Sequence, residues 1–122
     1  MASEQLTFKE MCARFDVTPR TLRYYEYIEL LSPEKEGRSR FYSPREVARM
    51  TLILRGRRWG FSLEEIRQWL LIYEDKGTSH QLKTFLEMAD RQLAVLKDER
   101  KALDSTIAEL QATRQEVAES LE

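Results

Sequence analysis

The chain has 122 residues, 42% of them hydrophobic and 34% charged, which suits one folded domain with an extension. No apolar run approaches the roughly 20 residues of a membrane span, and no signal peptide opens the chain, so we expect a cytoplasmic protein. Residues 1–61 carry 12 Lys and Arg against 8 Asp and Glu, a net +4, whereas residues 62–122 carry 8 against 13, a net −5; only the front half is therefore expected to meet nucleic acid.

The first predicted helix covers residues 7–15. Thr7 and Glu10 have the spacing of a capping box, in which the hydroxyl caps the helix and the glutamate reaches back to the cap. Cys12 is the only cysteine, which excludes an internal disulfide; it is either a small buried residue or a reactive or metal-binding thiol. One face of this helix is apolar and consists of Phe8, Met11, Cys12 and Phe15.

The second predicted helix begins at Thr18, whose hydroxyl can cap it, and Pro19, which suits the first helical position. The short turn before it predicts a helix-turn-helix, whose second helix enters the major groove of DNA. The guanidinium of Arg makes paired hydrogen bonds to guanine edges or phosphates, and Tyr hydroxyls contact phosphates. An exposed face of Arg and Tyr therefore favours DNA binding. A solvated helix with half-buried tyrosines is the alternative. The Arg and Tyr face consists of Arg20, Arg23, Tyr24 and Tyr27, and the opposite side carries Leu22, Tyr25 and Ile28.

Residues 34–42 predict a small β-hairpin, or wing, with Gly37 at its turn. Side chains alternate along a strand, so Phe41 is expected to face inward. A plain charged loop is the alternative. The expected outer face consists of Arg38, Arg40 and Tyr42.

Two further helices are predicted, over residues 44–58 and 63–75, each opened by a serine with a glutamate three residues later. Gly60 suits the end of the earlier one. A basic cluster at the turn between them either contacts a DNA backbone or is solvated; it consists of Arg55, Arg57 and Arg58. The residues expected to be buried are Val47, Met50 and Leu54, then Leu63, Ile66, Leu70 and Tyr73.

Gly77 interrupts the pattern within residues 75–79 and marks a linker or kink, so we expect a DNA-binding domain over 1–76 and a dimerisation helix over 77–122. His80 has no second ligand near it, and we predict no metal site and no cofactor. From residue 81 the apolar residues follow a heptad repeat, which predicts a helix of about 60 Å at 1.5 Å per residue. Nothing in the front half is long enough to cover this helix, so an identical chain is the economical partner. The predicted seam consists of Leu82, Leu86, Ala89, Leu93, Leu96, Arg100, Leu103 and Ile107.

The seam also predicts the direction of pairing. A parallel dimer would stack Arg100 on its own copy, and like-charge repulsion disfavours that arrangement. In an antiparallel pair centred near Val95, Leu93 faces the partner's Leu96, and Arg100 lies over a small alanine. We therefore predict an antiparallel coiled coil.

At this point the chain resembles the MerR family of bacterial transcription regulators, through four stretches in the family's order and spacing. They are T-P-R-T-L-R-Y-Y-E from Thr18, L-L-S-P from Leu30, R-S-R-F-Y-S from Arg38 and W-G-F-S-L-E-E-I from Trp59. The resemblance extends over essentially the whole chain.

The resemblance implies a mainly α fold, with a winged helix-turn-helix DNA-binding domain followed by a long C-terminal helix that forms an antiparallel coiled-coil dimer. It implies a regulator that binds a pseudo-palindromic promoter element as a homodimer and bends and untwists the DNA so that RNA polymerase can engage it. Together with the patterns above, it assigns DNA binding to Thr18, Arg20, Thr21, Arg23, Tyr24, Tyr25, Arg38, Arg40, Tyr42 and Arg58.

Residues 76–122 contain no cysteine, so the thiol-based metal or redox sensing that some family members perform near the dimerisation helix is not expected. Drug-sensing members carry a ligand-binding domain after the coil, and we expect no such domain here. The stretch from Leu52 to Leu63 is similar to a compact subgroup tied to branched-chain amino-acid and acyl-CoA breakdown. Any small-molecule effector would have to bind between the coil and the front domain; a regulator without an effector is the alternative.

Two other functions compete with DNA binding. An enzyme needs a nucleophile, a base or metal ligands in a suitable arrangement. The sequence has one Cys, one His and no phosphate-binding loop, and no such arrangement is visible in it. A coiled-coil interaction adaptor without specific DNA binding has no need for four arginines to line up on α-helix and wing. DNA binding that weakens steeply with salt separates the regulator from the adaptor.

Overall fold

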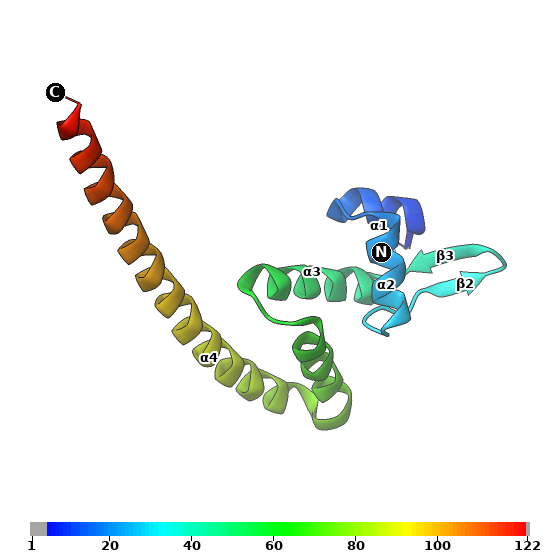
Figure 1. The fold of residues 1–122 in the computed structure, drawn as a ribbon. Helices are drawn as coiled ribbons and strands as arrows, with labels where there is room; N and C mark the ends of the chain where they lie inside the picture. Colours follow the sequence, from blue (N-terminus) through cyan, green and yellow to red (C-terminus); the bar gives the residue numbers. More distant parts are fainter. Residues whose placement is uncertain (1–4, 122) are drawn as a thin grey trace. The chain divides into compact units, whose positions relative to one another are not determined.

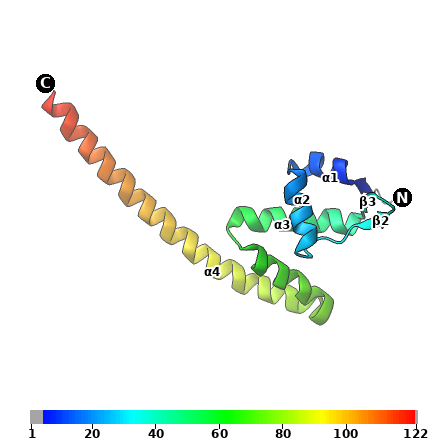
Figure 2. The same cartoon turned by 45° about the vertical axis from the view of Figure 1, so that its right-hand side comes forward.

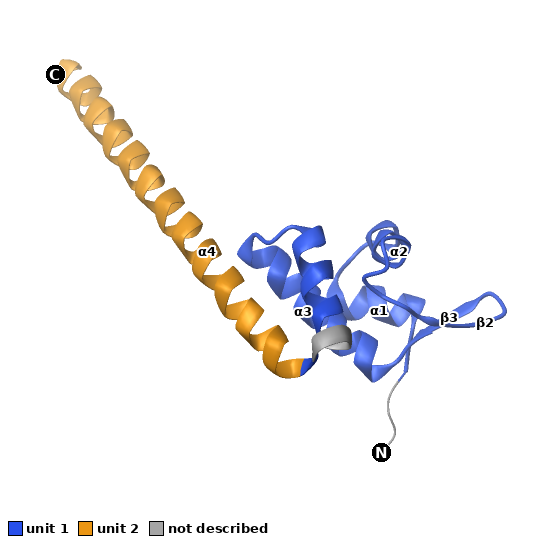
Figure 3. Ribbon diagram, turned by 90° about the horizontal axis from the view of Figure 1, so that it is seen from below, with its two compact units in different colours: residues 1–77 blue, residues 78–122 orange. Residues whose placement is uncertain are grey.

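The computed structural model describes residues 5–121, apart from the side chains of residues 73–76. It forms two compact units, Met1–Gly77 and Thr78–Glu122 (Figure 3). Of the helices in this described part, not one combines the length and the apolar character that crossing a membrane requires.

The elements of the first unit follow the order expected for a winged helix-turn-helix. In both Figure 1 and Figure 2, α1 is drawn above α3, and α2 runs down from α1 across α3. The predicted helix starts and the hairpin are confirmed, whereas strand β1 was not predicted. The elements are β1 (Leu6–Thr7), α1 (Phe8–Phe15), α2 (Pro19–Tyr27), β2 (Glu34–Glu36), β3 (Ser39–Tyr42), α3 (Pro44–Trp59) and α4 (Leu63–Ser120), the last of which continues into the second unit.

Side-chain caps fix the helix starts. The Thr7 hydroxyl accepts a hydrogen bond from the Glu10 N–H at 3.1 Å, and the Glu10 carboxylate accepts one from the Thr7 N–H at 2.9 Å, so this capping box is complete. At the start of α3 the Ser43 hydroxyl is the N-cap, but Glu46 does not reach back to it. Its carboxylate, in a residue only 7% exposed, instead accepts a hydrogen bond from the Ser32 N–H at 2.6 Å. Glu46 therefore ties the loop after α2 to the start of α3.

A three-stranded antiparallel sheet has the order β1-β3-β2. Leu6 pairs with Tyr42, and Glu36 pairs with Ser39 across a two-residue turn. Gly37 has φ of 60° at the first of the two turn positions, where a type II′ hairpin turn requires glycine. Residues 34–42 are therefore a wing and not a plain loop.

The core of the first unit differs in one helix from the prediction. Val47 and Leu54 of α3 are only half-buried, whereas Ile53 and Gly56 are buried. A glycine gives no apolar signal, so the sequence did not reveal that α3 turns this face inward. Ile66 and Leu70 are buried as predicted and Leu63 is half-buried, while Tyr73 lies outside the described side chains. The fully buried side chains are Met11, Leu22, Leu30, Tyr42, Met50 and Ile53.

Helix α4 is interrupted by one residue. Gly77 has φ of 84° and ψ of 178°, a conformation that essentially only glycine adopts. Of the linker or kink predicted within residues 75–79, the structure has the kink, at Gly77, after which the helix continues to Ser120. In the single chain the predicted seam is open to solvent, with Leu103 60% exposed and Ile107 46% exposed.

Candidate nucleic-acid interface

Helix α2 presents the Arg and Tyr face as predicted. The Thr18 hydroxyl accepts a hydrogen bond from the Thr21 N–H at 3.1 Å and so caps the helix. Leu22 is fully buried and Tyr25 is 7% exposed, which turns the opposite side of the helix outward. Tyr25 was also among the predicted DNA contacts, and its burial in the core removes its side chain from that role. All four residues of the predicted Arg and Tyr face are exposed, namely Arg20, Arg23, Tyr24 and Tyr27.

The wing corrects a second prediction. Arg38 lies at the turn and is exposed, but Arg40 is half-buried and Tyr42 is fully buried. Arg40 and Tyr42 do share one face of β3, as the alternation requires. That face is turned toward α2 and not toward solvent, so the Tyr42 side chain is not a surface contact.

Glu26 of α2 joins the two elements. One carboxylate oxygen lies 3.3 Å from Nε of Arg40, and the other accepts a hydrogen bond from the Tyr42 hydroxyl. Burial raises the pKa of Tyr42, and the neighbouring Glu26 raises it further, so the phenol stays a neutral donor. The Arg and Tyr pattern does not include Glu26; its one signal in the sequence is that an acidic residue stands between Arg23 and the wing arginines.

Phe8 of α1 lies next to both arginines. The guanidinium carbons of Arg23 and Arg40 are 5.5 Å and 5.6 Å from the centre of its ring. Cation–π contacts of this kind contribute roughly 0.5–2 kcal/mol each, depending on solvation. Phe8 was predicted as part of an apolar helix face; it also helps to hold two cations in place.

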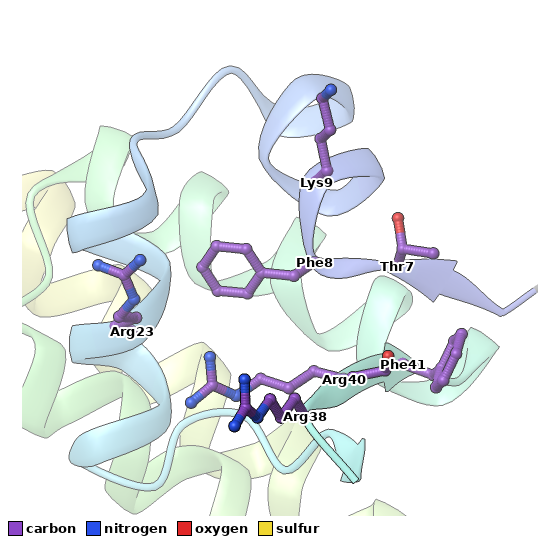
Figure 4. A pocket seen from close by; sticks show the side chains of 8 residues that line it. Thr7, Phe8, Lys9, Arg23, Arg38, Arg40 and Phe41 are labelled. Atoms are coloured by element: carbon purple, nitrogen blue, oxygen red, sulfur yellow. The ribbon is translucent and has the colours of Figure 1, made fainter. Parts of the chain in front are cut away.

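These side chains surround a hollow of about 280 Å³. Figure 4 shows Arg38 and Arg40 running from the wing toward α2, and Phe8 pointing from α1 toward Arg23, whereas Lys9 points away from them. The lining contains cationic residues but no carboxylate, so its chemistry suits an anion such as a backbone phosphate. The lining residues are Thr7, Phe8, Lys9, Arg23, Arg38, Ser39, Arg40 and Phe41.

Other predicted contacts lie outside this hollow. Tyr24 lines a second hollow, of about 550 Å³, together with Tyr27 and Arg67. Arg58 is exposed near the end of α3. Arg57, from the same basic cluster, donates a hydrogen bond to the Phe61 carbonyl at 3.2 Å and so acts on the turn after α3.

Cys12 is half-buried, and burial raises the pKa of its thiol, which disfavours the reactive thiolate. Among the described residues, no group of three or more His, Cys, Asp or Glu side chains is placed to hold a metal ion. Cys12 is not among the residues that line the hollow between α2 and the wing.

Known proteins resemble both parts of the chain. Residues 47–119 match the family described as "MerR, DNA binding", and residues 6–71 match "MerR HTH family regulatory protein". The HTH-type transcriptional regulator HmrR of Rhizobium leguminosarum bv. viciae is 35% identical over 104 residues, which cover 80% of this chain and 81% of that protein. The HTH-type transcriptional regulator ZntR of Escherichia coli K12 is 40% identical over 68 residues, which cover 54% of this chain and 48% of that protein.

Solved structures share the fold. A MerR family transcriptional regulator from Bacillus cereus superposes with a TM-score of 0.72 at 29% identity, over 86% of this chain and 76% of that one. HiNmlR, a MerR family regulator lacking the sensor domain and bound to promoter DNA, superposes with a TM-score of 0.63 at 18% identity, over 83% and 80% of the two chains.

Proposed function

The chain belongs to the MerR family of DNA-binding transcriptional regulators, and we propose that it binds a pseudo-palindromic promoter element as a homodimer and distorts the DNA to control RNA polymerase. The observation that carries the proposal is the cationic hollow between α2 and the wing. Arg23 comes from the helix and Arg38 and Arg40 come from the wing, so both elements can hold the same stretch of DNA backbone.

The position of Arg20 gives it a different role from Arg23. Residues near the start of a recognition helix reach base edges, and Arg20 is the second residue of α2 and exposed. We therefore assign Arg20 to a base edge and the arginines of the hollow to phosphates. Deformation of the DNA between the two half-sites would make unread central bases matter as well.

The second unit supports the homodimer. Leu93 is 50% exposed and Leu103 60% exposed on a helix that continues for most of the unit. Soluble monomers rarely leave an apolar stripe of this length uncovered, and a second copy would cover it. Two copies also provide the two recognition helices that a pseudo-palindrome requires.

We propose that the chain acts by binding alone and has no enzymatic activity, as expected for a relative of transcriptional regulators. Its place of action would be the cytoplasm, where a bacterial promoter is accessible. We assign it no cofactor, and a small-molecule effector is not needed for the DNA contacts proposed above.

Selection of genomic DNA fragments with the purified protein tests the proposal. We expect recovery of an inverted repeat within a promoter, and an affinity that falls steeply with salt, with a log–log slope of about −0.9 for each phosphate contacted. Recovery of random fragments alone would instead favour an interaction adaptor, with the Arg and Tyr face merely solvated.

Two substitutions then separate base from phosphate contacts. Arg20→Ala should cost roughly 1–3 kcal/mol on the recovered repeat and relax its sequence preference. Arg23→Ala should weaken binding to the repeat and to random duplex alike, and reduce the salt slope by about 1. Arg91→Ala, an exposed arginine of the second unit, is the control and should change neither. Equal losses on both duplexes for Arg20→Ala would reassign Arg20 to a phosphate.

A further inference from the structure

We propose that Glu26 is a positioning residue for DNA binding, which holds the wing against the recognition helix α2 and directs Arg40 into the cationic hollow. Glu26 can have this role only under the proposed function, in which Arg40 contacts DNA. Neither the Arg and Tyr pattern nor the hollow's lining includes Glu26, yet it links α2 to the wing through Arg40 and Tyr42.

Both carboxylate oxygens of Glu26 contact side chains of β3. One lies 3.3 Å from Nε of Arg40, and the other accepts the hydrogen bond from Tyr42. The Glu26 side chain is only 12% exposed and the Arg40 side chain 34% exposed, so water competes weakly for these contacts. Since Arg40 and Tyr42 are two residues apart on one strand face, the pair of bonds restrains both the position and the rotation of the wing.

The contact through Nε also orients the guanidinium. Figure 4 shows the terminal nitrogens of Arg40 on the side of α2 that carries Arg23. The Phe8 ring lies within 5.6 Å of both guanidinium carbons, so the two cations are held on one aromatic side chain. A pair of arginines fixed in this way is organised before DNA arrives, which reduces the entropy lost on binding.

An acid at this place is otherwise unfavourable for a protein that binds a polyanion. Its negative charge weakens the attraction of the surrounding cations for any phosphate, regardless of sequence. Its benefit is restricted to DNA that requires the helix and the wing in a fixed relation, namely the specific site. Removal of the charge should therefore act in opposite directions on specific and random DNA.

The test compares Glu26→Gln with the wild type on two probes, the inverted repeat recovered by genomic selection and a random-sequence duplex of equal length. Glutamine keeps the size but is neutral and has one accepting oxygen in place of two, so the ion pair with Arg40 and the charge-assisted hydrogen bond from Tyr42 are both lost. Affinity for the repeat should fall about tenfold, as expected for the loss of one charge-assisted hydrogen bond. Affinity for the random duplex should stay equal or rise. Glu36→Gln, which removes the same charge from an exposed position on β2, is the control and should leave the ratio of the two affinities unchanged.

A double-mutant comparison adds a readout that a purely structural role would not change. Arg40→Ala should weaken binding to the repeat strongly in the wild type and only slightly in Glu26→Gln, because the guanidinium is no longer directed in the latter. Equal effects of Arg40→Ala in both backgrounds would overturn the inference. If Glu26→Gln keeps the selectivity of the wild type for the repeat, the inference is overturned and the proposed function stands. If the wild type itself selects no site, both the inference and the proposed function are overturned.

Should circular dichroism show that Glu26→Gln does not fold, Tyr42→Phe takes its place. This change keeps the buried ring and removes one of the two donors. Affinity for the repeat should then fall severalfold with the random duplex unchanged, and an unchanged ratio would overturn the inference.

Discussion

The side chain of Ile66 occupies the space directly above Gly56, where helix α3 meets the start of α4. A Cβ atom at position 56 would lie 2.9 Å from Cδ1 and 3.0 Å from Cγ1 of Ile66. Because Ile66 is only 4% exposed, it has little room to move away. Glycine at position 56 therefore lets the two helices approach closely.

Replacing Gly56 with alanine should destabilise the protein. Alanine favours a helix by about 1 kcal/mol over glycine, but overpacking of a core costs typically 1–3 kcal/mol. We expect a net loss of about 1 kcal/mol in the free energy of unfolding, measured by urea denaturation. Ala48→Gly, at an exposed position of the same helix, is the control and reports helix propensity alone.

The Ile66→Val background tests the cause. Valine lacks the Cδ1 atom nearest the added methyl group, so the loss caused by Gly56→Ala should shrink there or become a gain. A coupling energy of at least 0.5 kcal/mol is expected for side chains in contact. Additive effects of the two substitutions would refute the close contact as the reason for glycine at position 56.

Local chemistry determines the parts of this fold that the sequence predicted. A hydroxyl at Thr7, Thr18 or Ser43 satisfies helix N–H groups wherever the rest of the chain lies, so each helix start could be located in advance. Gly60 likewise ends α3 with φ of 99°, as predicted from its residue type.

Tertiary packing determines the parts that the sequence did not predict. A period of two places Arg40 and Tyr42 on one strand face but does not say which face packs against the helices. Here Glu26 of α2 contacts both residues, and Phe8 of α1 contacts Arg40, on the face that was predicted to be the outer one. Glu46 had the spacing of a capping box, yet the backbone of Ser32 competes for its carboxylate. Glu26 gave a weak signal because its partners are 14 and 16 residues away in sequence.

The hydroxyl of Tyr42 should contribute measurably to stability. Tyr42→Phe leaves the ring in the core but deprives the Glu26 carboxylate of a donor. Loss of a hydrogen bond to a charged group costs roughly 1.5–3 kcal/mol, which should appear as a lower urea midpoint without a change in slope. Tyr24→Phe, which removes a hydroxyl from a side chain 50% exposed, should stay within about 0.5 kcal/mol of the wild type. Equal effects of both changes would mean that the hydrogen bond from Tyr42 to Glu26 stabilises the protein no more than a hydrogen bond to water does.

Alkaline pH should destabilise the protein through the same residue. The pKa of Tyr42 is raised above its ordinary value of about 10, chiefly by burial and then by Glu26, so the folded state keeps a proton that the unfolded state loses. This contribution to stability is fully present below pH 10 and is lost as pH rises above it, by up to about 1.4 kcal/mol per pH unit. Urea denaturation between pH 9 and 11 should show a steeper decline for the wild type than for Tyr42→Phe. Both proteins should also carry Cys12→Ser, because the raised pKa of the Cys12 thiol likewise lowers stability as pH rises. Parallel declines would contradict the assignment.

The direction of the proposed coiled coil can be read from single cysteines in the Cys12→Ser background. In the antiparallel register Leu86 faces the partner's Leu103, whereas two copies of position 86 are separated by 17 residues of helix, or about 25 Å. A disulfide requires Cα atoms about 4–7 Å apart. Leu86→Cys alone and Leu103→Cys alone should therefore fail to cross-link under mild oxidation, while an equimolar mixture of the two variants should form a covalent dimer on a non-reducing gel.

In a parallel coil each position meets its own copy, so efficient cross-linking of Leu86→Cys by itself would show that the predicted direction is wrong. Size-exclusion chromatography with light scattering is the necessary companion measurement, because a monomeric chain would cross-link in neither experiment.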